Sequence, residues 1–347
     1  MRITGIHKWC LSFICAMLFL RLTVSGAEAA SDTGYRYMES SCYTYEDMQA
    51  DLKLLQQQYP QHIHVDSLGM TADGRDLYHI VVGDEKAENQ VLIFASIHAR
   101  EYITAQLSMR QAGDLLKRWN DNEKYCEVEL DELMRDTAVH FVPMINPDGV
   151  TLCQRGLDGM QMAETRQNLY RIYEMDGAVE LKDYFRKWKS NARGVDINRN
   201  FDADWERYDD RLGHPSSDHF KGTEPESEAE TRALTNLTKK YKFKRTISYH
   251  TQGNVIYWYF GQSGELKRES RDFAEMISGE TGYRVDSDYE KLDPAGYKDW
   301  AISKMSIPSV TIEVGTGQSP VEAKQFQGIW EQNRDVCLSM IYSLGRE

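Results

Sequence analysis

The chain has 347 residues and an ordinary globular composition, with 41% hydrophobic and 27% charged side chains, 24 Gly and 8 Pro. This composition argues against a disordered, collagen-like or coiled-coil protein. The formal net charge at pH 7 is −13, from 54 Asp and Glu against 41 Lys and Arg. Nucleic acid and anionic membrane surfaces repel a chain this acidic, so we expect neither as a partner.

The first thirty residues have the pattern of a secretory signal peptide. Basic residues precede an apolar run from Trp9 to Leu20, and Ala27-Glu28-Ala29 supplies a small-x-small cleavage site. The run is shorter than the roughly 20 residues that a membrane-spanning helix needs, and no later segment is apolar enough to cross a bilayer. We therefore expect removal of residues 1–29, secretion to the extracellular or cell-wall space, and no stable membrane insertion afterwards. An uncleaved anchor is the alternative.

The mature part of the chain, residues 30–347, is expected to be one domain, because no repeat or low-complexity linker divides it. It keeps four cysteines, and the absence of a C-x-x-C pair argues against a zinc-cysteine module. Export permits disulfides without requiring them, and the sequence does not choose among the possible pairings. The four cysteines are Cys42, Cys126, Cys153 and Cys337.

Predicted strands and helices alternate along this domain. The pattern predicts strands at 63–65, 77–82, 91–97, 138–145, 195–197, 246–249, 255–260 and 310–314. It predicts helices at 44–58, 102–119, 226–241, 265–279 and 328–344. Asn146-Pro147-Asp148-Gly149 predicts a turn, and the polar stretch between it and Gly194 is expected to be irregular. Strands separated by helices indicate an α/β fold with a largely parallel central sheet.

Four of these strands end in side chains that can bind a metal, move a proton or hold an anion. His98 and Glu101 follow the strand at 91–97, and Asn198 and Arg199 follow the strand at 195–197. His250 follows the strand at 246–249, and Glu313 lies at the end of the strand at 310–314. Ligands of open α/β sheets bind outside the carboxyl ends of the strands. We therefore expect these side chains to converge on one site.

His98-x-x-Glu101 together with the distant His250 predicts a catalytic zinc site. Two nitrogens and one carboxylate leave a tetrahedral zinc ion one open position for water, and we expect one Zn²⁺ per chain. A helix-start ion pair between Glu101 and Arg100 is the alternative reading of the H-x-x-E motif alone.

Glu313 and the Asn198-Arg199 pair could also take part in such a site. Glu313 beside an activated water would be the general base, which later protonates the leaving amine. Asn198 has an amide and Arg199 a planar guanidinium group, and together they are suited to binding a carboxylate. The alternatives are an exposed carboxylate for Glu313 and a salt bridge from Arg199 to Asp196 or Asp202.

The other histidines have simpler explanations. We expect His79 and His140 to be structural histidines with satisfied hydrogen bonds inside strands. The His62-Ile63-His64 pattern resembles the His-x-His motif of barrel hydrolases, but the later strand-end His and Asp of that motif are missing, so we expect surface or edge positions. His214 and His219 are expected to be solvated in a polar loop.

Taken together, these motifs resemble the zinc carboxypeptidases of the carboxypeptidase A type. The resemblance spans roughly Tyr43 to Leu344 and is greatest to the bacterial branch that contains γ-D-glutamyl-meso-diaminopimelate peptidases. The motifs occur in the family's order: His-x-x-Glu, Asn-Pro-Asp-Gly, Gly-Val-Asp-x-Asn-Arg-Asn, a strand-end His and Thr-Ile-Glu-Val-Gly. The resemblance implies a mixed, largely parallel central sheet flanked by helices.

The resemblance also implies roles for individual residues. His98, Glu101 and His250 would be the zinc ligands, Glu313 the general acid/base, and Asn198 with Arg199 the holders of the substrate's terminal carboxylate. Lys189 would supply the cation that stabilises the oxyanion, with Arg193 as the competitor. Tyr289 best matches the mobile tyrosine that closes over substrate, with Tyr297 as the alternative. Lys298 matches a residue that lines the specificity pocket, where it would favour a carboxylate-bearing group such as the second carboxyl of diaminopimelate.

The implied activity is hydrolysis of a C-terminal peptide bond or a γ-glutamyl-diaminopimelate amide by zinc-activated water. The expected partner is a peptide or muropeptide with a free carboxylate, and the protein is expected to be a monomer. Three alternatives stay open at this point. They are a general peptide metallocarboxypeptidase, an N-acyl amino acid deacylase on the same fold, and a catalytically silent wall-binding relative.

Overall fold

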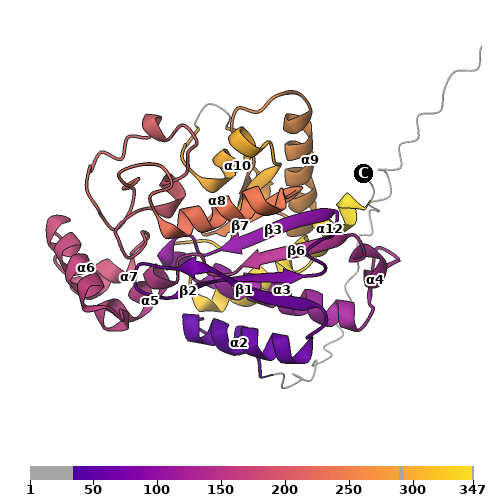
Figure 1. The fold of residues 1–347 in the computed structure, drawn as a ribbon. Coiled ribbons are helices and arrows are strands. Elements are labelled where there is room, and N and C mark those ends of the chain that lie inside the picture. Colours follow the sequence, from indigo (N-terminus) through magenta and orange to yellow (C-terminus); the bar gives the residue numbers. More distant parts are fainter. Residues whose placement is uncertain (1–33, 289–291, 346–347) are drawn as a thin grey trace, which may run out of the picture. The chain divides into compact units, whose positions relative to one another are not determined.

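An eight-stranded mixed sheet forms the centre of the fold (Figure 1). The computed structural model describes residues 34–288 and 292–345, so the predicted signal peptide and Tyr289 lie outside the described residues. The strands lie in the order β1-β2-β6-β3-β7-β10-β8-β9. Their bounds are β1 Ile63–Met70, β2 Asp76–Val82, β3 Asn89–Ala95, β6 Thr137–Val142, β7 Arg245–His250, β8 Val255–Tyr257, β9 Arg284–Val285 and β10 Ser309–Glu313. A separate two-stranded ribbon joins β4 Lys124–Tyr125 to β5 Val128–Glu129.

The middle of the sheet is parallel, as the sequence predicts. Strands β6, β3, β7 and β10 run in the same direction. The pairs β1–β2, β2–β6 and β10–β8 are antiparallel, and the edge strand β9 pairs parallel with β8. The carboxyl ends of β3, β7 and β10 therefore meet at one edge of three adjacent strands. This arrangement confirms the predicted α/β class with a mixed, largely parallel sheet.

Helices cover both faces of the sheet (Figure 1). Their bounds are α1 Arg36–Glu39, α2 Tyr45–Gln58, α3 Ile103–Asn120, α4 Leu130–Leu133, α5 Pro147–Arg155, α6 Ala163–Met175, α7 Leu181–Arg186, α8 Ala229–Tyr241, α9 Gly264–Thr281, α10 Tyr297–Met305, α11 Phe326–Asn333 and α12 Val336–Leu344. Apolar residues of α2, α3, α9, α11 and α12 form a core with one face of the sheet, and those of α8 and α10 form a core with the other.

Strand β3 illustrates how the two cores are built. Val91 and Ile93 belong to the core under α3, whereas Leu92 and Phe94 belong to the core under α8 and α10. Successive side chains of a strand point to opposite faces, and here both faces are apolar because both are covered. A run of consecutive apolar residues is therefore what a buried parallel strand requires.

The start of helix α2 follows directly from its sequence. The Thr44 hydroxyl accepts a hydrogen bond from the backbone N–H of Asp47, and the Asp47 carboxylate accepts one from the backbone N–H of Thr44. This capping box satisfies N–H groups that the first turn of a helix leaves without partners. The predicted start of this helix is confirmed.

Four predictions of secondary structure are wrong. Residues 195–197 form no strand, because the Asp196 N–H donates to Phe220 in a loop and Ile197–Arg199 is a short 3-10 turn. Asn146 caps helix α5 by accepting from the Gly149 N–H, so the Asn-Pro-Asp-Gly motif begins a helix.

The segment expected to be irregular contains helices α6 and α7 in addition, and they pack against α5 in a small third core. The single closing helix predicted at 328–344 is two helices, α11 and α12, which residues 334–335 separate.

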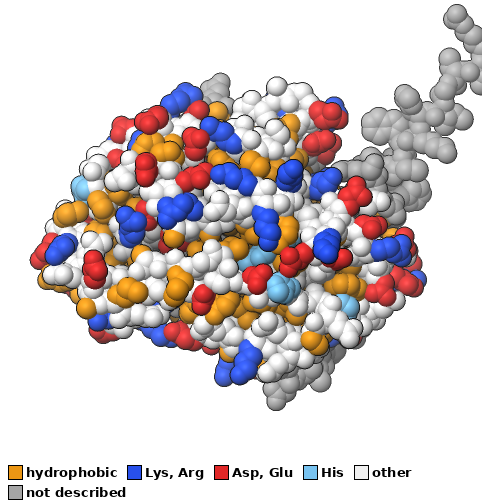
Figure 2. All heavy atoms as spheres, in the orientation of Figure 1, with side chains coloured by type: hydrophobic (Ala, Val, Ile, Leu, Met, Phe, Trp, Pro, Cys, Tyr) orange, Lys and Arg blue, Asp and Glu red, His pale blue; other side chains and the backbone are white. Residues whose placement is uncertain are grey.

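The surface and the cysteines agree with the composition. The face drawn in Figure 2 carries both acidic and basic side chains, with several Lys and Arg side chains in a row across its middle. Among the described residues, no helix is both long and apolar enough to span a membrane. No disulfide joins the cysteines of this part of the chain: Cys42 and Cys126 are exposed, and Cys153 and Cys337 are buried.

Candidate active site

The ends of three adjacent parallel strands bring together the side chains that the sequence singles out. His98 and Glu101 belong to the connection between β3 and α3, His250 is the last residue of β7, and Glu313 is the last residue of β10. In the sheet, Glu313 is the direct register partner of His250. All four side chains line one cleft with a volume of about 600 Å³.

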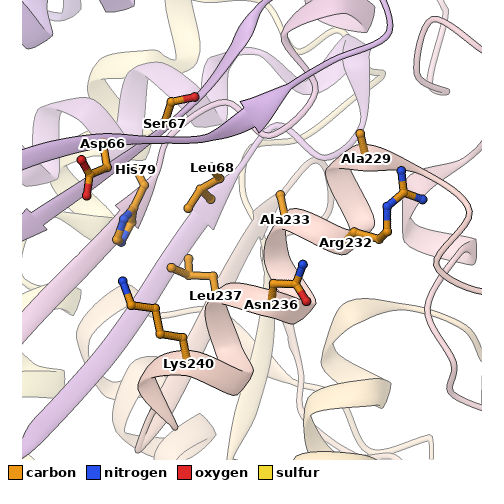
Figure 3. A pocket seen from close by; sticks show the side chains of 10 residues that line it. All are labelled: Asp66, Ser67, Leu68, His79, Ala229, Arg232, Ala233, Asn236, Leu237 and Lys240. Carbon is orange, nitrogen blue, oxygen red and sulfur yellow. The ribbon is translucent and has the colours of Figure 1, made fainter.

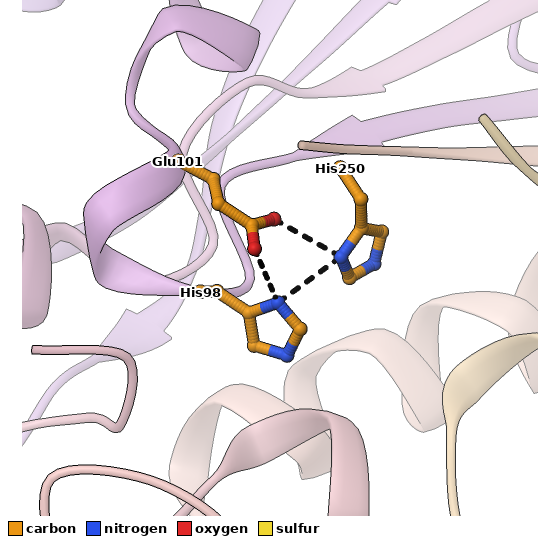
Figure 4. Close-up of side chains that lie close together, drawn as sticks. All are labelled: His98, Glu101 and His250. Atoms are coloured by element: carbon orange, nitrogen blue, oxygen red, sulfur yellow. Dashed lines mark hydrogen bonds and ion pairs between the residues drawn. The ribbon is translucent and has the colours of Figure 1, made fainter. Parts of the chain in front are cut away.

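His98, Glu101 and His250 form a compact buried cluster (Figure 4). The Glu101 carboxylate lies 2.9 Å from His98 Nδ1 through Oε1 and 3.1 Å from His250 Nδ1 through Oε2. The two Nδ1 atoms are only 3.1 Å apart. Two ring nitrogens at this distance repel each other unless a proton or a cation lies between them, so the arrangement fits a cation site.

The two imidazoles of the cluster differ in their electrostatics: burial opposes protonation of His250, but the Glu101 carboxylate outweighs it and raises the pKa of His250. Burial lowers the pKa of His98 below its usual value, which keeps a lone pair available for a metal. Burial alone would raise the pKa of Glu101, but the two imidazoles hold it below its usual range and keep the carboxylate ionised. Two imidazoles and one carboxylate, all with less than a tenth of their surface exposed, are a donor set that suits catalytic zinc.

Asp196 connects the cluster to a lysine. Its carboxylate lies 3.3 Å from His98 Nε2 through Oδ1 and 2.9 Å from Lys189 Nζ through Oδ2. Burial alone would raise the pKa of Asp196, but Lys189 and His98 hold it well below its usual range. A carboxylate behind a metal-binding histidine fixes the ring orientation and its tautomer. No pattern in the sequence predicts this contact, and from the sequence Asp196 is only a possible partner of Arg199.

The two candidates for the oxyanion cation differ in where they lie. Lys189 lines the cleft and is mostly buried, whereas the Arg193 side chain is 59% exposed and its Nε faces Glu228 at 3.7 Å. Arg100 lines the cleft as well, and its guanidinium donates to the backbone oxygen of Lys187. The alternative reading, an ion pair between Arg100 and Glu101, is therefore not what the structure contains.

Glu313 has the environment of an acid/base group. Val310 and Ile312 of β10 point into the core, so Thr311 and Glu313 point to the cleft. Burial raises the pKa of Glu313 to about 7, Glu101 adds to the increase, and His250 and Lys189 oppose it. A carboxyl group with a pKa near the working pH can both accept and return a proton.

Asn198 and Arg199 lie on the same cleft, held in different ways. The Asn198 side-chain oxygen accepts the backbone N–H of Tyr297 at 3.1 Å, which leaves its amide NH₂ free to donate. Arg199 donates from Nη1 to the Asn198 backbone oxygen and from Nη2 to the carboxylate of Asp293. Its ion-pair partner is thus Asp293, and the salt bridge to Asp196 or Asp202 that is the alternative interpretation is not formed.

Two of the three remaining candidates for substrate contacts, Lys298 and Tyr297, can be located in the structure. The Lys298 ammonium lines the cleft, contacts the Asp299 carboxylate and donates to the Tyr259 backbone oxygen at 3.1 Å. The Tyr297 hydroxyl lies 2.8 Å from Thr238 in the core, with 1% of the residue exposed, so Tyr297 is not placed to close over a substrate. Tyr289 lies outside the described residues.

The two strand histidines are structural, as expected, and form a buried chain. His79 Nε2 lies 2.8 Å from His140 Nδ1, and His140 Nε2 lies 2.5 Å from the Gln90 side-chain oxygen. Because Gln90 donates its NH₂ to backbone oxygens, its oxygen accepts from His140, and His140 in turn accepts from His79. Figure 3 shows His79 with Asp66 and Lys240 beside a surface pocket between β1 and α8.

Because His79 and His140 are buried, we expect the protein to lose stability in mild acid. Burial lowers the pKa of His79 to about 4, whereas an unfolded histidine titrates near 6.5. Between these values the unfolded chain binds a proton that the folded chain does not, so the free energy of unfolding falls as the pH drops from 6.5 to 4. The difference amounts to about 3 kcal/mol from His79.

Urea unfolding at pH 7 and pH 4 measures this effect. The loss should shrink in His79→Gln and stay at the wild-type value in His64→Gln, whose histidine is exposed. An equal loss in all three proteins would contradict the assignment.

The buried His–Glu–His cluster at the ends of parallel strands has the donor set of a metal-binding protein. A family model described as zinc carboxypeptidase matches residues 48–336. The chain therefore belongs to the zinc carboxypeptidase family and is a zinc metallopeptidase.

Individual relatives agree with this membership. Gamma-D-glutamyl-L-diamino acid endopeptidase 1 of Lysinibacillus sphaericus is 30% identical over 301 residues, which are 86% of this chain and 72% of that protein. Human mast cell carboxypeptidase A is 23% identical over 253 residues, or 72% of this chain and 54% of that protein. The solved structure of bovine thrombin-activatable fibrinolysis inhibitor with tick carboxypeptidase inhibitor has the same fold. Its TM-score is 0.66 at 17% identity, and the match covers 87% of this chain and 97% of that one.

Proposed function

We propose that the protein hydrolyses the amide bond between γ-D-glutamate and a diamino acid in bacterial wall peptides. The observation that carries this proposal is the 30% identity, over 86% of the chain, to a relative named for γ-D-glutamyl-L-diamino acid cleavage. His98, Glu101 and His250 would hold one zinc ion per chain, and the converging Nδ1 and carboxylate atoms support this assignment.

The catalytic roles follow from the chemistry of the cleft. A zinc ion bound there would supply Lewis acidity, which would make a water molecule more acidic and polarise the scissile carbonyl. Glu313 takes a proton from the attacking water and returns it to the departing amine. The Lys189 ammonium, fixed by Asp196, stabilises negative charge that develops on the carbonyl oxygen. Asn198 donates its amide NH₂ to the part of the substrate beyond the scissile bond.

Lys298 is proposed to recognise the second carboxyl group of diaminopimelate. Its ammonium has three N–H donors, and Asp299 and Tyr259 account for two of them. Lys298→Ala should raise KM about tenfold for a diaminopimelate-containing peptide, because a charge-assisted hydrogen bond is lost. kcat should change less than about twofold.

A peptide that carries alanine in place of diaminopimelate provides the control for Lys298, since it lacks the second carboxyl group. Steady-state kinetics on the two peptides measure the selectivity. Equal losses on both peptides would show that Lys298 serves the fold of the cleft and not the recognition of substrate.

The proposal includes secretion and a monomeric state. Wall peptides lie outside the cytoplasmic membrane, and the signal peptide predicted for residues 1–29 would deliver the protein there. Light scattering of the purified protein and assay of the culture medium test these two parts separately.

Digestion of purified muropeptides, with products identified by mass spectrometry, tests the proposed activity. The expected product pair is a peptide ending in γ-D-glutamate and a fragment beginning with the diamino acid, formed only without a chelator. Ordinary C-terminal peptides and N-acyl amino acids serve as comparison substrates. Faster cleavage of the former would make the protein a general carboxypeptidase, and faster cleavage of the latter would make it a deacylase.

A further inference from the structure

The carboxylate-binding arginine of the cleft is already paired with an acid of the same chain. The Arg199 guanidinium donates to the Asp293 carboxylate, and the guanidinium carbon lies 5.0 Å from the ring centre of Tyr208. The Arg199 side chain is 11% exposed, whereas that of Asp293 is 67% exposed. Asp293 therefore lies between a buried cation and the solvent, and both residues line the cleft.

This pair changes what the cleft offers to a substrate carboxylate. An incoming carboxylate must either displace Asp293 from Arg199 or lie beside it, and two like charges at such a distance repel. Asp286 and Asp288 line the same cleft and add negative charge. A free terminal carboxylate thus gains less from Arg199 than it would from an unpaired guanidinium.

A neutral group does not meet this obstacle. The Asn198 amide NH₂ can donate to the oxygen of an amide as readily as to that of a carboxylate, because both are acceptors. An amide carbonyl carries no net charge, so Asp293 does not repel it. Asp293 therefore does not electrostatically disfavour a chain that continues beyond the residue after the scissile bond.

We infer that Asp293 is a specificity-determining residue that makes the protein tolerant of substrates without a free terminal carboxylate, which is an endopeptidase mode of action. This inference rests on the proposed function and deepens it, since it concerns which wall peptides are cleaved. It assigns Asp293 no part in the chemical step.

The test compares two γ-D-glutamyl-L-lysine peptides that differ only in a free carboxylate or a carboxamide on the lysine. Wild-type kcat/KM for the two should agree within about tenfold. Asp293→Asn keeps the shape and removes the charge, so it should raise the ratio of free acid to amide at least about tenfold, through a lower KM for the acid. Asp202→Asn is the matched control, because Asp202 pairs with Lys304, does not line the cleft, and should leave the ratio unchanged.

A binding measurement separates failure of this inference from failure of the proposed function. N-acetyl-L-lysine and its amide are titrated by calorimetry into the zinc-loaded wild type and Asp293→Asn. The variant should bind the acid at least about tenfold more tightly and the amide unchanged. If γ-glutamyl peptides stay intact while this gain appears, the proposed function fails and the role of Asp293 stands. An unchanged affinity for the acid, or a wild type that prefers the acid a hundredfold, overturns the inference.

Discussion

Glu313→Gln should retain zinc and lose at least about a thousandfold in kcat. Glutamine has nearly the same shape as glutamate but cannot accept a proton from water or return it to the leaving amine. Glu313 is not among the three side chains of the buried cluster, so its replacement leaves the proposed metal ligands in place. Steady-state kinetics on a γ-D-glutamyl peptide and zinc content by mass spectrometry give the two measurements.

Glu322→Gln provides the matched control, since this glutamate follows β10 but is exposed and pairs with Lys324. It should keep full activity and full zinc content. If Glu313→Gln turned over at a tenth of the wild-type rate or faster, another group would have to be the base. If it lost zinc instead, Glu313 would be a ligand and the kinetic result would not report on proton transfer.

His250→Ala should lose both zinc and activity. His250 is 2% exposed, and its Nδ1 lies within 3.1 Å of both His98 Nδ1 and the Glu101 carboxylate, so alanine removes one of three donors. Loss of one ligand should lower zinc content from one ion per chain to near zero after dialysis. Activity should fall by at least about a thousandfold, and added zinc at micromolar concentration should not restore it.

A chelator should have the same effect on the wild type, but reversibly. His64→Ala is the control for a histidine near a possible cation group, because His64 with Asp66 and Glu85 is exposed. It should keep both zinc and activity. Circular dichroism shows whether His250→Ala is folded, and a folded variant that retains stoichiometric zinc would contradict the proposed ligand set.

Much of the site could be predicted because its residues stand at the ends of strands. Apolar runs at 91–97 and 310–314 have to be strands, and parallel strands in a right-handed α/β fold end at the same edge. A polar side chain immediately after such a run therefore has few places to lie. His98, His250 and Glu313 could be assigned to one cleft for this reason alone.

The contacts between loops could not be predicted in this way. Asp293 meets Arg199 across 94 residues of sequence, and no periodic pattern connects the two. Val195-Asp196-Ile197 has the apolar alternation of a strand, but its N–H and C=O groups find partners in loops. Helices α6 and α7 carry many charged residues and few buried ones, because they pack only against a small core on one side.

The pairing of β10 with β7 makes this cleft intolerant of length changes inside the strands. Side chains alternate between the two faces of a strand, so inserting one residue into β10 would send the Glu313 carboxylate into the apolar layer beneath the sheet. Insertions in the segments that follow the strands would leave this alternation of side chains between the two faces unchanged. Natural variation in chain length among functional homologues should accordingly fall in the loops, where it can reshape the mouth of the cleft without disturbing the reacting groups.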